Sequence, residues 1–453
     1  MFRIIVAMCL FGFLASPTAM AGQADTILVN ANVITADPTR PTAQAIALAG
    51  DRIRAVGSSA AVRRLAGPKT QIVDLQGRSV IPGLMDAHVH LLIAPSIVDE
   101  RSLKAYQQAA LPKVMSGFLS HGVTTVRSTA DPLPYITQLR DRLERGEISG
   151  PRLLVTGPTP SSPGGHPATT VCHDNPYCRQ GVAREPSNEV QARQVVRELA
   201  DAKVDAVKVT LDNSIPSVRS IPLLSDAVVA ALVDETHRNG RRIIAHVQTD
   251  AAATGRFARM GFDEFVHVPP NIQTPSERSS LAAVLAGRKM AVTATLSISD
   301  AYRDTTGRER LYWGVPYNPG LRQAFEAAVE TTKVFADAGV KLVVGTDWVA
   351  DSDFARNDDV RLDDARLLPG ALTLHEMELL RRAGLSTSAV LAAATRSAAE
   401  ALGIIEKVGT VTEGKLADLV ILDGDPLQDL AALRRTVAVL KGGRVVSGAL
   451  PTR

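Results

Sequence analysis

The stretch Val80–Leu91, VIPGLMDAHVHL, decides the fold and raises the question of function. An apolar, strand-like run stops at Pro82, and His88 and His90 follow one residue apart. Because alternate residues of a β-strand point to the same face, these two imidazoles are predicted to point in one direction. Such a pair is either a polar pair in a hydrated cleft or the first half of a metal site.

Outward from this stretch, from about residue 80 to 400, strand-like runs alternate with helical stretches. The helical stretches, such as NEVQARQVVRELADAK, carry apolar residues at three-to-four spacing. The strand-like runs are VIPGLMDAHVH, VTTVRST, RLLVTGP, DAVKVTL, RRIIAHV, DEFVHVP, AVTATLS and KLVVGTD. Eight strands alternating with helices predict an α/β fold, the (β/α)8 TIM barrel, in which active sites lie at the C-terminal ends of the strands.

Short β-rich segments flank this region at both ends of the chain. Near the N-terminus they include TILVNANVIT and AIALAGDRIRAVG, and near the C-terminus ADLVILDGDP and VAVLKGGRVVSG, where Gly442-Gly443 predicts a tight turn. We expect the two ends to pair into one small β-sandwich. The expected domains are residues 22–80 plus 405–453 for this sandwich and residues 81–404 for the barrel.

The first residues, 1–21, are typical of a secretory signal. One Arg precedes an apolar run, and small residues follow up to Ala21, where cleavage is expected. The alternative, a short membrane anchor, is disfavoured because the apolar run is too short to span comfortably. The sequence thus predicts a secreted, periplasmic protein that has no membrane segment after cleavage.

Only two cysteines remain after this cleavage, Cys172 and Cys178 in VCHDNPYC. An exported chain meets oxidising conditions, so a disulfide that closes this loop is expected. Free thiols, or a metal knot that includes His173, are the alternatives.

The overall composition argues for a globular protein with a large core. The chain has 453 residues, and 45% of them are hydrophobic, which is enough to bury a large core. The net charge is +3, and Lys and Arg are spread along the chain without a basic block, so no nucleic-acid partner is indicated. The sequence leaves a homo-oligomer open.

Six polar residues interrupt the apolar strand-like runs, and on a barrel all of them would meet at one mouth. They are His88, His90, Lys208, His246, His267 and Asp347. Because a structural zinc site closes with four ligands, six groups suit two metal ions that share ligands. An ammonium cannot bind a cation, so Lys208 must be neutral or modified, and a carbamate made with CO2 would supply two bridging oxygens. Alternatively, Lys208 pairs with Asp205 or Asp212, which would leave a single metal ion.

In their order along the chain, several motifs resemble those of the amidohydrolase superfamily of metal-dependent hydrolases. The motifs are PGLMDAHVHL, DAVKV, IIAHV, FVHV, VGTDW and GTVTEGKLADLVILDGDPL. The resemblance covers nearly all of the mature chain. It is greatest to the imidazolonepropionase-like branch, which includes Xaa-Pro dipeptidases.

This resemblance implies two divalent metal ions, with zinc as the first expectation, and a set of ligands for each. The implied ligands are His88, His90 and Asp347 for the more buried ion, His246 and His267 for the more exposed ion, and carbamylated Lys208 between them. Asp347 would also take the proton of a metal-bridging hydroxide, which attacks an amide (C–N) bond, and pass it to the leaving group.

The expected substrate is a dipeptide (Xaa-Pro-like) or an N-acyl amino acid. One alternative keeps the site but changes the bond to that of a cyclic amide or a lactone. An alternative of another class is a non-catalytic, metal-loaded periplasmic binding protein.

Further candidates concern contact with the substrate. His166 lies in the Gly-rich loop SSPGGHPATT, and the resemblance places it beside the substrate as a catalytic contact, with loop stabilisation as the alternative. Arg127 ends the second strand-like run and is predicted either to bind a substrate carboxylate or to form a core ion pair. Arg219 is a more exposed candidate for the same carboxylate.

Aromatic residues gather near the end of the barrel strands in a chain with only 4% aromatics. Tyr312 and Trp313 lie in the loop after the seventh run, and Trp348 follows Asp347 directly. These residues are predicted to form an aromatic wall over the site, with an ordinary packed loop as the alternative.

Overall fold

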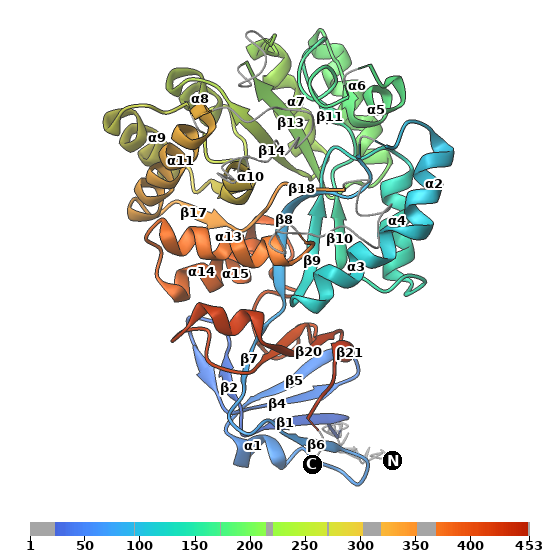
Figure 1. Ribbon diagram of the computed structural model, residues 1–453, viewed down its shortest axis with the longest axis vertical. Helices are drawn as coiled ribbons and strands as arrows, with labels where there is room; N and C mark the ends of the chain where they lie inside the picture. The colour runs from blue at the N-terminus through green and yellow to red at the C-terminus, as the bar shows by residue number, and fades with distance from the viewer. Residues whose placement is uncertain are drawn as a thin grey trace, which may run out of the picture.

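The computed structural model describes residues 23–94, 96–172, 174–213, 221–269, 271–301, 319–350 and 368–451. A β-rich part, which contains both ends of the described chain, lies below a larger α/β part (Figure 1). Among the residues in these ranges, no helix is long and apolar enough to cross a membrane. The expected signal, residues 1–21, lies outside the described residues.

The β-rich part is built from both ends of the chain, which Figure 1 shows in blue and red. Its strands are β1 (Thr26–Val29), β2 (Asn32–Ile34), β3 (Thr42–Ala43), β4 (Ala45–Ala49), β5 (Arg52–Gly57), β6 (Gln71–Asp74), β7 (Ser79–Pro82), β19 (Leu419–Leu422), β20 (Thr436–Lys441) and β21 (Arg444–Gly448). They form two sheets, in the orders β5-β4-β1-β6 and β21-β20-β19-β7-β2-β3. One hydrophobic cluster takes Leu28 and Ile46 from the first sheet and Val80, Leu419 and Ile421 from the second. The two ends of the chain therefore share a core.

The predicted turn at Gly442-Gly443 joins β20 to β21, which pair antiparallel. Both glycines have positive φ, 54° and 72°. Residues with a Cβ rarely adopt this conformation, so the turn explains why glycine occupies both positions.

Nine strands form the two large parallel sheets of the α/β part among the described residues. They are β8 (Leu84–His90), β9 (Val123–Ser128), β10 (Arg152–Val155), β13 (Ala206–Asp212), β14 (Arg242–Gln248), β15 (Glu264–Val266), β16 (Ala291–Thr293), β17 (Lys341–Val343) and β18 (Trp348–Val349). They form two sheets, in the orders β10-β9-β8-β18 and β13-β14-β15-β16-β17. The first eight of these strands correspond to the eight predicted runs, and β18 begins directly after the last run, which ends at Asp347.

Backbone hydrogen bonds link the two parallel sheets at both margins. Ala87 N–H donates to Val344 O (2.9 Å) beside β8, and Asp205 N–H donates to Val155 O (2.8 Å) between β13 and β10. The strand order is therefore that of a TIM-barrel-like α/β domain. A short parallel pair, β11 (Thr159–Pro160) with β12 (Ala183–Arg184), lies beside β13.

Helices surround these strands (Figure 1). Their bounds are α2 (Glu100–Ala109), α3 (Leu111–Ser120), α4 (Tyr135–Glu144), α5 (Pro176–Val182), α6 (Glu189–Asp201), α7 (Asp226–Arg238), α8 (Ala251–Ala258), α9 (Pro275–Gly287), α10 (Leu296–Ala301), α11 (Pro319–Asp337), α13 (Ala371–Arg382), α14 (Thr387–Ala393) and α15 (Arg396–Ala401), with α1 (Ser59–Arg63) and the 3-10 helix η2 (Leu430–Arg434) beside the β-rich part. Helix α6 illustrates why they form. The Asn188 side chain caps its first turn, and Ala192, Val196 and Leu199 bury one face at the predicted spacing.

A buried carboxylate ties two of these helices together. Glu376 of α13 is fully buried and accepts hydrogen bonds from the backbone N–H groups of Leu296 (3.0 Å) and Ser297 (2.6 Å) at the start of α10. Burial raises the pKa of Glu376 to about 7, although the two backbone hydrogen bonds oppose this shift.

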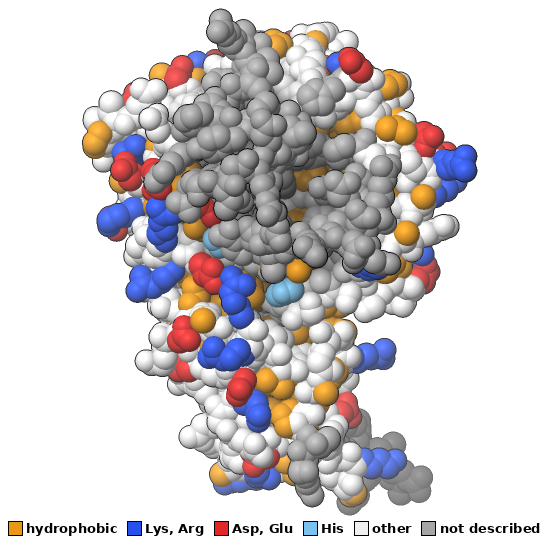
Figure 2. Space-filling view, in the orientation of Figure 1, with side chains coloured by type: hydrophobic (Ala, Val, Ile, Leu, Met, Phe, Trp, Pro, Cys, Tyr) orange, Lys and Arg blue, Asp and Glu red, His pale blue; other side chains and the backbone are white. Residues whose placement is uncertain are grey.

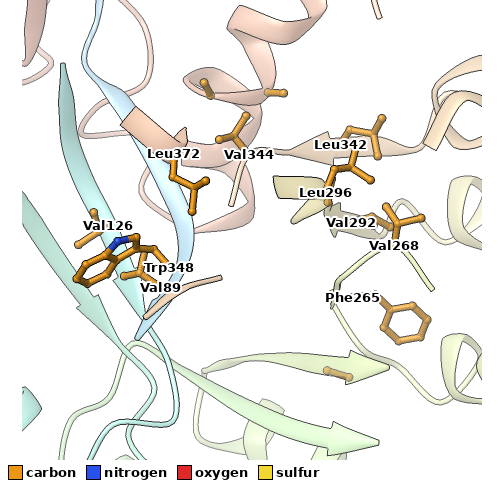
Figure 3. Packing of buried hydrophobic residues seen from close by; sticks show 14 of the residues in the cluster. Val89, Val126, Phe265, Val268, Val292, Leu296, Leu342, Val344, Trp348 and Leu372 are labelled. Carbon is orange, nitrogen blue, oxygen red and sulfur yellow. The ribbon is translucent and has the colours of Figure 1, made fainter. Parts of the chain in front are cut away.

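Strand β13 shows how the core and the polar side of the sheet are separated. Val207, Val209 and Leu211 are fully buried and belong to the main hydrophobic cluster. Because side chains alternate along a strand, Lys208 and Asp212 lie on the opposite face. Two further strands of this sheet, β15 and β16, add Phe265 and Val292 to the same hydrophobic cluster (Figure 3).

Cys172 and Cys178 form a disulfide, as predicted. It closes the loop that runs from the segment carrying His166 into helix α5. On the face of the molecule drawn in Figure 2, basic and acidic side chains are interspersed over the described surface. This agrees with the absence of a basic block in the sequence.

Candidate metal centre

The first cluster of the site joins the end of β8 to the segment between β17 and β18. His88 Nε2 and His90 Nε2 lie 3.0 Å and 2.9 Å from the same oxygen of Asp347, Oδ1. The three ligand atoms lie within 4.8 Å of one another, and His88 is fully buried. The structure therefore brings together the two imidazoles and the carboxylate that the sequence indicated.

A buried carboxylate below the histidines aligns these two segments. Asp86 accepts hydrogen bonds from the Thr346 backbone N–H (3.1 Å), from the hydroxyls of Thr346 and Thr373 (2.8 Å each) and from the backbone N–H of His88 (3.2 Å). Burial raises the pKa of Asp86 to about 6, and the hydrogen bonds oppose the shift. Asp86 thus fixes β8 against the segment that carries Asp347.

Two of the predicted ligands have a left-handed backbone. The φ angle is 58° at Asp347 and 71° at His267. Residues other than glycine rarely adopt this conformation, which costs about 1–3 kcal/mol and is concentrated at functional sites. His267 follows the last residue of β15, and Asp347 lies between β17 and β18; both side chains lie beside other predicted ligands.

The charge of Asp347 is favoured by its neighbours. Burial alone would raise its pKa, but the hydrogen bonds with His88 and His90 outweigh burial and hold the pKa of Asp347 well below its usual range. The carboxylate is therefore ionised and available as a ligand or as a proton acceptor.

Lys208 lies beside the first cluster. Its Nζ is 3.2 Å from His88 Nε2 and 3.2 Å from the Thr129 hydroxyl. Burial lowers the pKa of Lys208 to about 7, and attraction to Asp347 opposes this shift. A neutral amine is the form that can react with CO2 or approach a cation, so its surroundings fit the modification that the sequence analysis raised.

A second cluster lies on the other side of the site. The ligand atoms of His166, Asp212 and His246 also lie within 4.8 Å of one another. His246 Nε2 is 3.3 Å from Asp212 Oδ2, and the His166 ring centroid is 4.8 Å from that of His246. Burial lowers the pKa of both histidines to about 3, so their imidazoles are neutral, as metal ligands must be.

His267 lies between the two clusters. Its ring centroid is 5.2 Å from that of His88 and 4.4 Å from that of His246. The contact of its Nδ1 with the Thr295 hydroxyl (2.7 Å) fixes the ring and leaves Nε2 available. Burial holds the pKa of His267 well below its usual range, so this ring is neutral too.

The chemistry of these donors fits divalent metal ions. Neutral imidazoles with a carboxylate make the two-histidine, one-carboxylate set of many catalytic zinc sites, which keep one position open for water or substrate. Imidazole and carboxylate ligands also suit manganese, cobalt and iron.

Arg127 does not face a substrate, which corrects one of the two readings of this residue. It is 1% exposed and forms a bidentate ion pair with Glu264 of β15. Its Nε also donates to Ala87 O (2.9 Å), and the Thr293 hydroxyl donates to Glu264 (2.6 Å). The core ion pair, rather than a carboxylate site, is the alternative that the structure supports.

Trp348 also differs from its expected place in an aromatic wall. It is 2% exposed, and its ring contacts Phe118 edge-on, with centroids 5.8 Å apart. Figure 3 shows it beside Val89 and Val126, within the packed core. Tyr312, Trp313 and Arg219 lie outside the described residues.

Sequence reasoning missed Asp86 and Glu264 and did not identify Asp212 as part of the site. Glu264 interrupts the apolar run DEFVHVP, and Asp212 lies on the same strand face as Lys208. The sequence analysis did not use the position of Glu264, and it predicted Asp212 only as a possible partner of Lys208.

The fold and the two clusters are those of a metal-dependent hydrolase, and comparisons with known proteins agree. The profile of the amidohydrolase family matches residues 79–446. The chain belongs to the amidohydrolase family and is a hydrolase acting on carbon–nitrogen bonds.

Individual similar proteins point to the predicted branch. The chain is 25% identical over 399 residues to imidazolonepropionase of Mesorhizobium japonicum, covering 84% of this chain and 86% of that protein. A shorter match, 35% identical over 102 residues, is to N-substituted formamide deformylase of Arthrobacter pascens; it covers 22% of this chain and only 19% of that protein.

Solved structures show the same fold. A prolidase complexed with N-methylphosphonate-L-proline superposes with a TM-score of 0.77 at 23% identity, covering 94% of this chain and all (100%) of that chain. A Xaa-Pro dipeptidase with bound methionine in the active site gives 0.73 at 21% identity, covering 93% and 99%. The predicted resemblance to the imidazolonepropionase-like and Xaa-Pro dipeptidase-related branch is confirmed.

Proposed function

We propose that this protein is an exported, periplasmic amidohydrolase that cleaves the amide bond of a dipeptide (Xaa-Pro-like) or an N-acyl amino acid. The observation that carries the proposal is the approach of His88 and His90 to one oxygen of Asp347 at the ends of adjacent strands. The names of the similar structures, a prolidase and a Xaa-Pro dipeptidase, support the substrate class. We also propose that the two parallel sheets close into one barrel and that the terminal sheets form a sandwich.

The chemistry divides between bound ions and the chain's own residues. Two divalent ions, zinc in the first place, would polarise the scissile carbonyl and lower the pKa of a bound water. The carboxylate of Asp347 would accept the proton of the attacking water and return it to the leaving nitrogen. Lys208, as a carbamate, would supply two oxygens between the two clusters.

A second substrate class is favoured by the ion pair of Arg127. Glu264 occupies both terminal nitrogens of its guanidinium, so this arginine does not hold a substrate carboxylate. A cyclic amide or a lactone needs no such anchor, and the same clusters could act on it. The proposal therefore includes this class as the alternative.

The test combines metal analysis with hydrolysis. We expect about two metal equivalents per chain in the mature protein purified with bicarbonate, and turnover within a panel of dipeptides, N-acyl amino acids, cyclic amides and lactones. Asp347→Asn should abolish turnover. A protein that binds metal but hydrolyses none of the panel would support the binding-protein alternative, and one that binds no metal would refute a metal-dependent hydrolase.

Export needs its own measurement. N-terminal sequencing of the protein from periplasmic extract should begin at Gly22 if the signal is cut after Ala21. Recovery of the whole chain, residues 1–21 included, from the cytoplasmic fraction would contradict this part of the proposal.

A further inference from the structure

Thr129 is a buried residue of the site that the predicted ligand set does not include. It follows β9 directly and is fully buried (0% exposed). Its backbone N–H donates to Val89 O (2.9 Å), and Val89 lies between His88 and His90 on the adjacent strand. The backbone of Thr129 is therefore fixed against the strand that carries two of the predicted ligands.

The carbonyl and the hydroxyl of Thr129 contact two different members of the site. The carbonyl oxygen is 2.6 Å from His90 Nδ1. Because a carbonyl only accepts, Nδ1 carries the hydrogen, and Nε2 is left for a metal ion. The hydroxyl is 3.2 Å from Lys208 Nζ. One residue thus orients a ligand ring through its backbone and contacts the lysine through its side chain.

The Thr129 hydroxyl is the contact of Lys208 that a bound ion would leave in place. The base of the lysine side chain is held by β13, where the Thr159 hydroxyl donates to Lys208 O (2.9 Å). Among the described residues, its Nζ contacts His88 Nε2 and the Thr129 hydroxyl, both at 3.2 Å. His88 Nε2 also lies 3.0 Å from Asp347 Oδ1 and is the atom that an ion would occupy. Of the two contacts, the hydroxyl then remains.

Carbamylation leaves one hydrogen on the lysine nitrogen. The neutral amine forms a bond to the carbon of CO2 and loses one proton to water, so the product is a planar carbamate with a single N–H. The direction of this N–H sets the plane of the two carbamate oxygens. An acceptor beside the nitrogen therefore decides where these oxygens point, and the Thr129 hydroxyl is an acceptor at 3.2 Å.

We propose that Thr129 is the positioning residue of Lys208: its hydroxyl accepts the remaining N–H of the carbamate and so holds the carbamate oxygens between the first and second clusters. The inference rests on the proposed two-metal site with a carbamate, but not on any substrate. Thr129 has no part in the reaction itself and acts through the lysine.

The first experiment measures how metal binding depends on bicarbonate in Thr129→Val. This change removes the hydroxyl but keeps the shape of the side chain and the carbonyl that contacts His90. Thr125→Val is the matched control, because Thr125 lies on the same strand, is equally buried and has a hydroxyl without a hydrogen-bond partner among the described residues. Thr129→Ser retains the hydroxyl and should behave like the native protein.

Each protein is stripped of metal and refilled with Zn²⁺ at increasing bicarbonate concentrations. Thr129→Val should need about five- to tenfold more bicarbonate than the native protein for half recovery of the second equivalent, because a lost hydrogen bond changes an equilibrium constant by about this factor. Thr125→Val should match the native protein. Equal bicarbonate dependence in the native protein and Thr129→Val would overturn the inference, and so would an equal shift in Thr125→Val.

The second experiment observes the carbamate itself by nuclear magnetic resonance with ¹³C-labelled bicarbonate. Its signal should be present in the native protein, absent from Lys208→Met, and weaker in Thr129→Val than in Thr125→Val at the same bicarbonate concentration. If circular dichroism shows that Thr129→Val is unfolded, Thr129→Ala replaces it in both experiments. Equal signals in the two variants would overturn the role of Thr129 and leave the two-metal function intact. Fewer than two metal equivalents in the native protein under all conditions would refute the two-metal site and the inference together.

Discussion

Breaking the ion pair between Arg127 and Glu264 from one side should strongly destabilise the α/β part. The pair is bidentate, and the side chains are 2% and 0% exposed. Replacing Glu264 with Leu removes two charge-assisted hydrogen bonds, each worth about 1.5–3 kcal/mol, and leaves a buried guanidinium. The expected loss is therefore about 3–6 kcal/mol of unfolding free energy, close to the ~3–5 kcal/mol known for broken buried pairs.

The reciprocal variant and the double variant make the argument quantitative. Arg127→Met leaves a carboxylate, which can take up a proton, whereas a guanidinium stays charged. Arg127→Met should therefore be the milder single change and should recover stability at low pH. The double variant Arg127→Met/Glu264→Leu should regain most of the stability, because apolar residues replace both charges.

The measurement is denaturant unfolding of four proteins: the native protein, the two single variants and the double variant. Their metal content is a second measurement. The double variant should keep its metal and, once a carboxylate substrate is known, an unchanged KM. A KM that rises more than about tenfold in a stable double variant would show that Arg127 binds the substrate, and the placement of this arginine in the core would then be wrong. If the double variant loses as much unfolding free energy as the two single variants together, Arg127 and Glu264 do not stabilise each other, and the ion-pair argument is refuted.

Three further predictions test other parts of the molecule. Gly345→Ala should lower the melting temperature and metal content together, because its Cβ would lie 2.3 Å from Thr293 Cγ2; unchanged values would show that the strand can shift to make room. Glu376 should contribute a fall in the unfolding free energy as pH rises from about 4.5 to about 7, because burial raises its pKa in the folded protein to about 7; the buried neutral histidines contribute the opposite slope, so this effect is measured as the difference between the native protein and Glu376→Gln. Its contribution is about 3 kcal/mol, and Glu376→Gln should remove that slope in urea titrations at several pH values; parallel curves for the two proteins would contradict it. Replacing Cys172 and Cys178 with Ser should cost about 2 kcal/mol, because the disulfide closes a short loop, and should speed proteolysis there; equal protease sensitivity would argue that the loop is held by its packing alone.

Much of the first cluster could be predicted because its rules are local. Alternation along one strand places His88 and His90 on one face, whatever the rest of the chain does. The C-terminal end of a barrel strand is likewise where catalytic groups are expected, and Asp347 follows such a run. Distance along the chain did not matter for these predictions.

Other features depend on partners that no local rule selects. Arg127 had two readings, and the one that holds is decided by Glu264, which is 137 residues away in the chain. No local pattern in the sequence predicts the left-handed backbone at His267 and Asp347. Alternation along the strand predicts that Asp212 shares a face with Lys208. Its contact with His246 could not be predicted, because it depends on how two strands pair in the folded chain.

The pairing of β7 with β19 has a consequence for how the protein is made. Pro82 and Leu419 are partners in this pairing, and Gly83 alone separates β7 from the strand that carries His88 and His90. During synthesis, β8, which carries His88 and His90, emerges early. Strand β19, which pairs with β7 directly before β8, emerges almost last. Contacts between residues so distant in sequence form slowly, so we expect late folding and early vulnerability to aggregation. Truncation before β19 should therefore leave a chain that contains every predicted metal ligand and still cannot assemble the site.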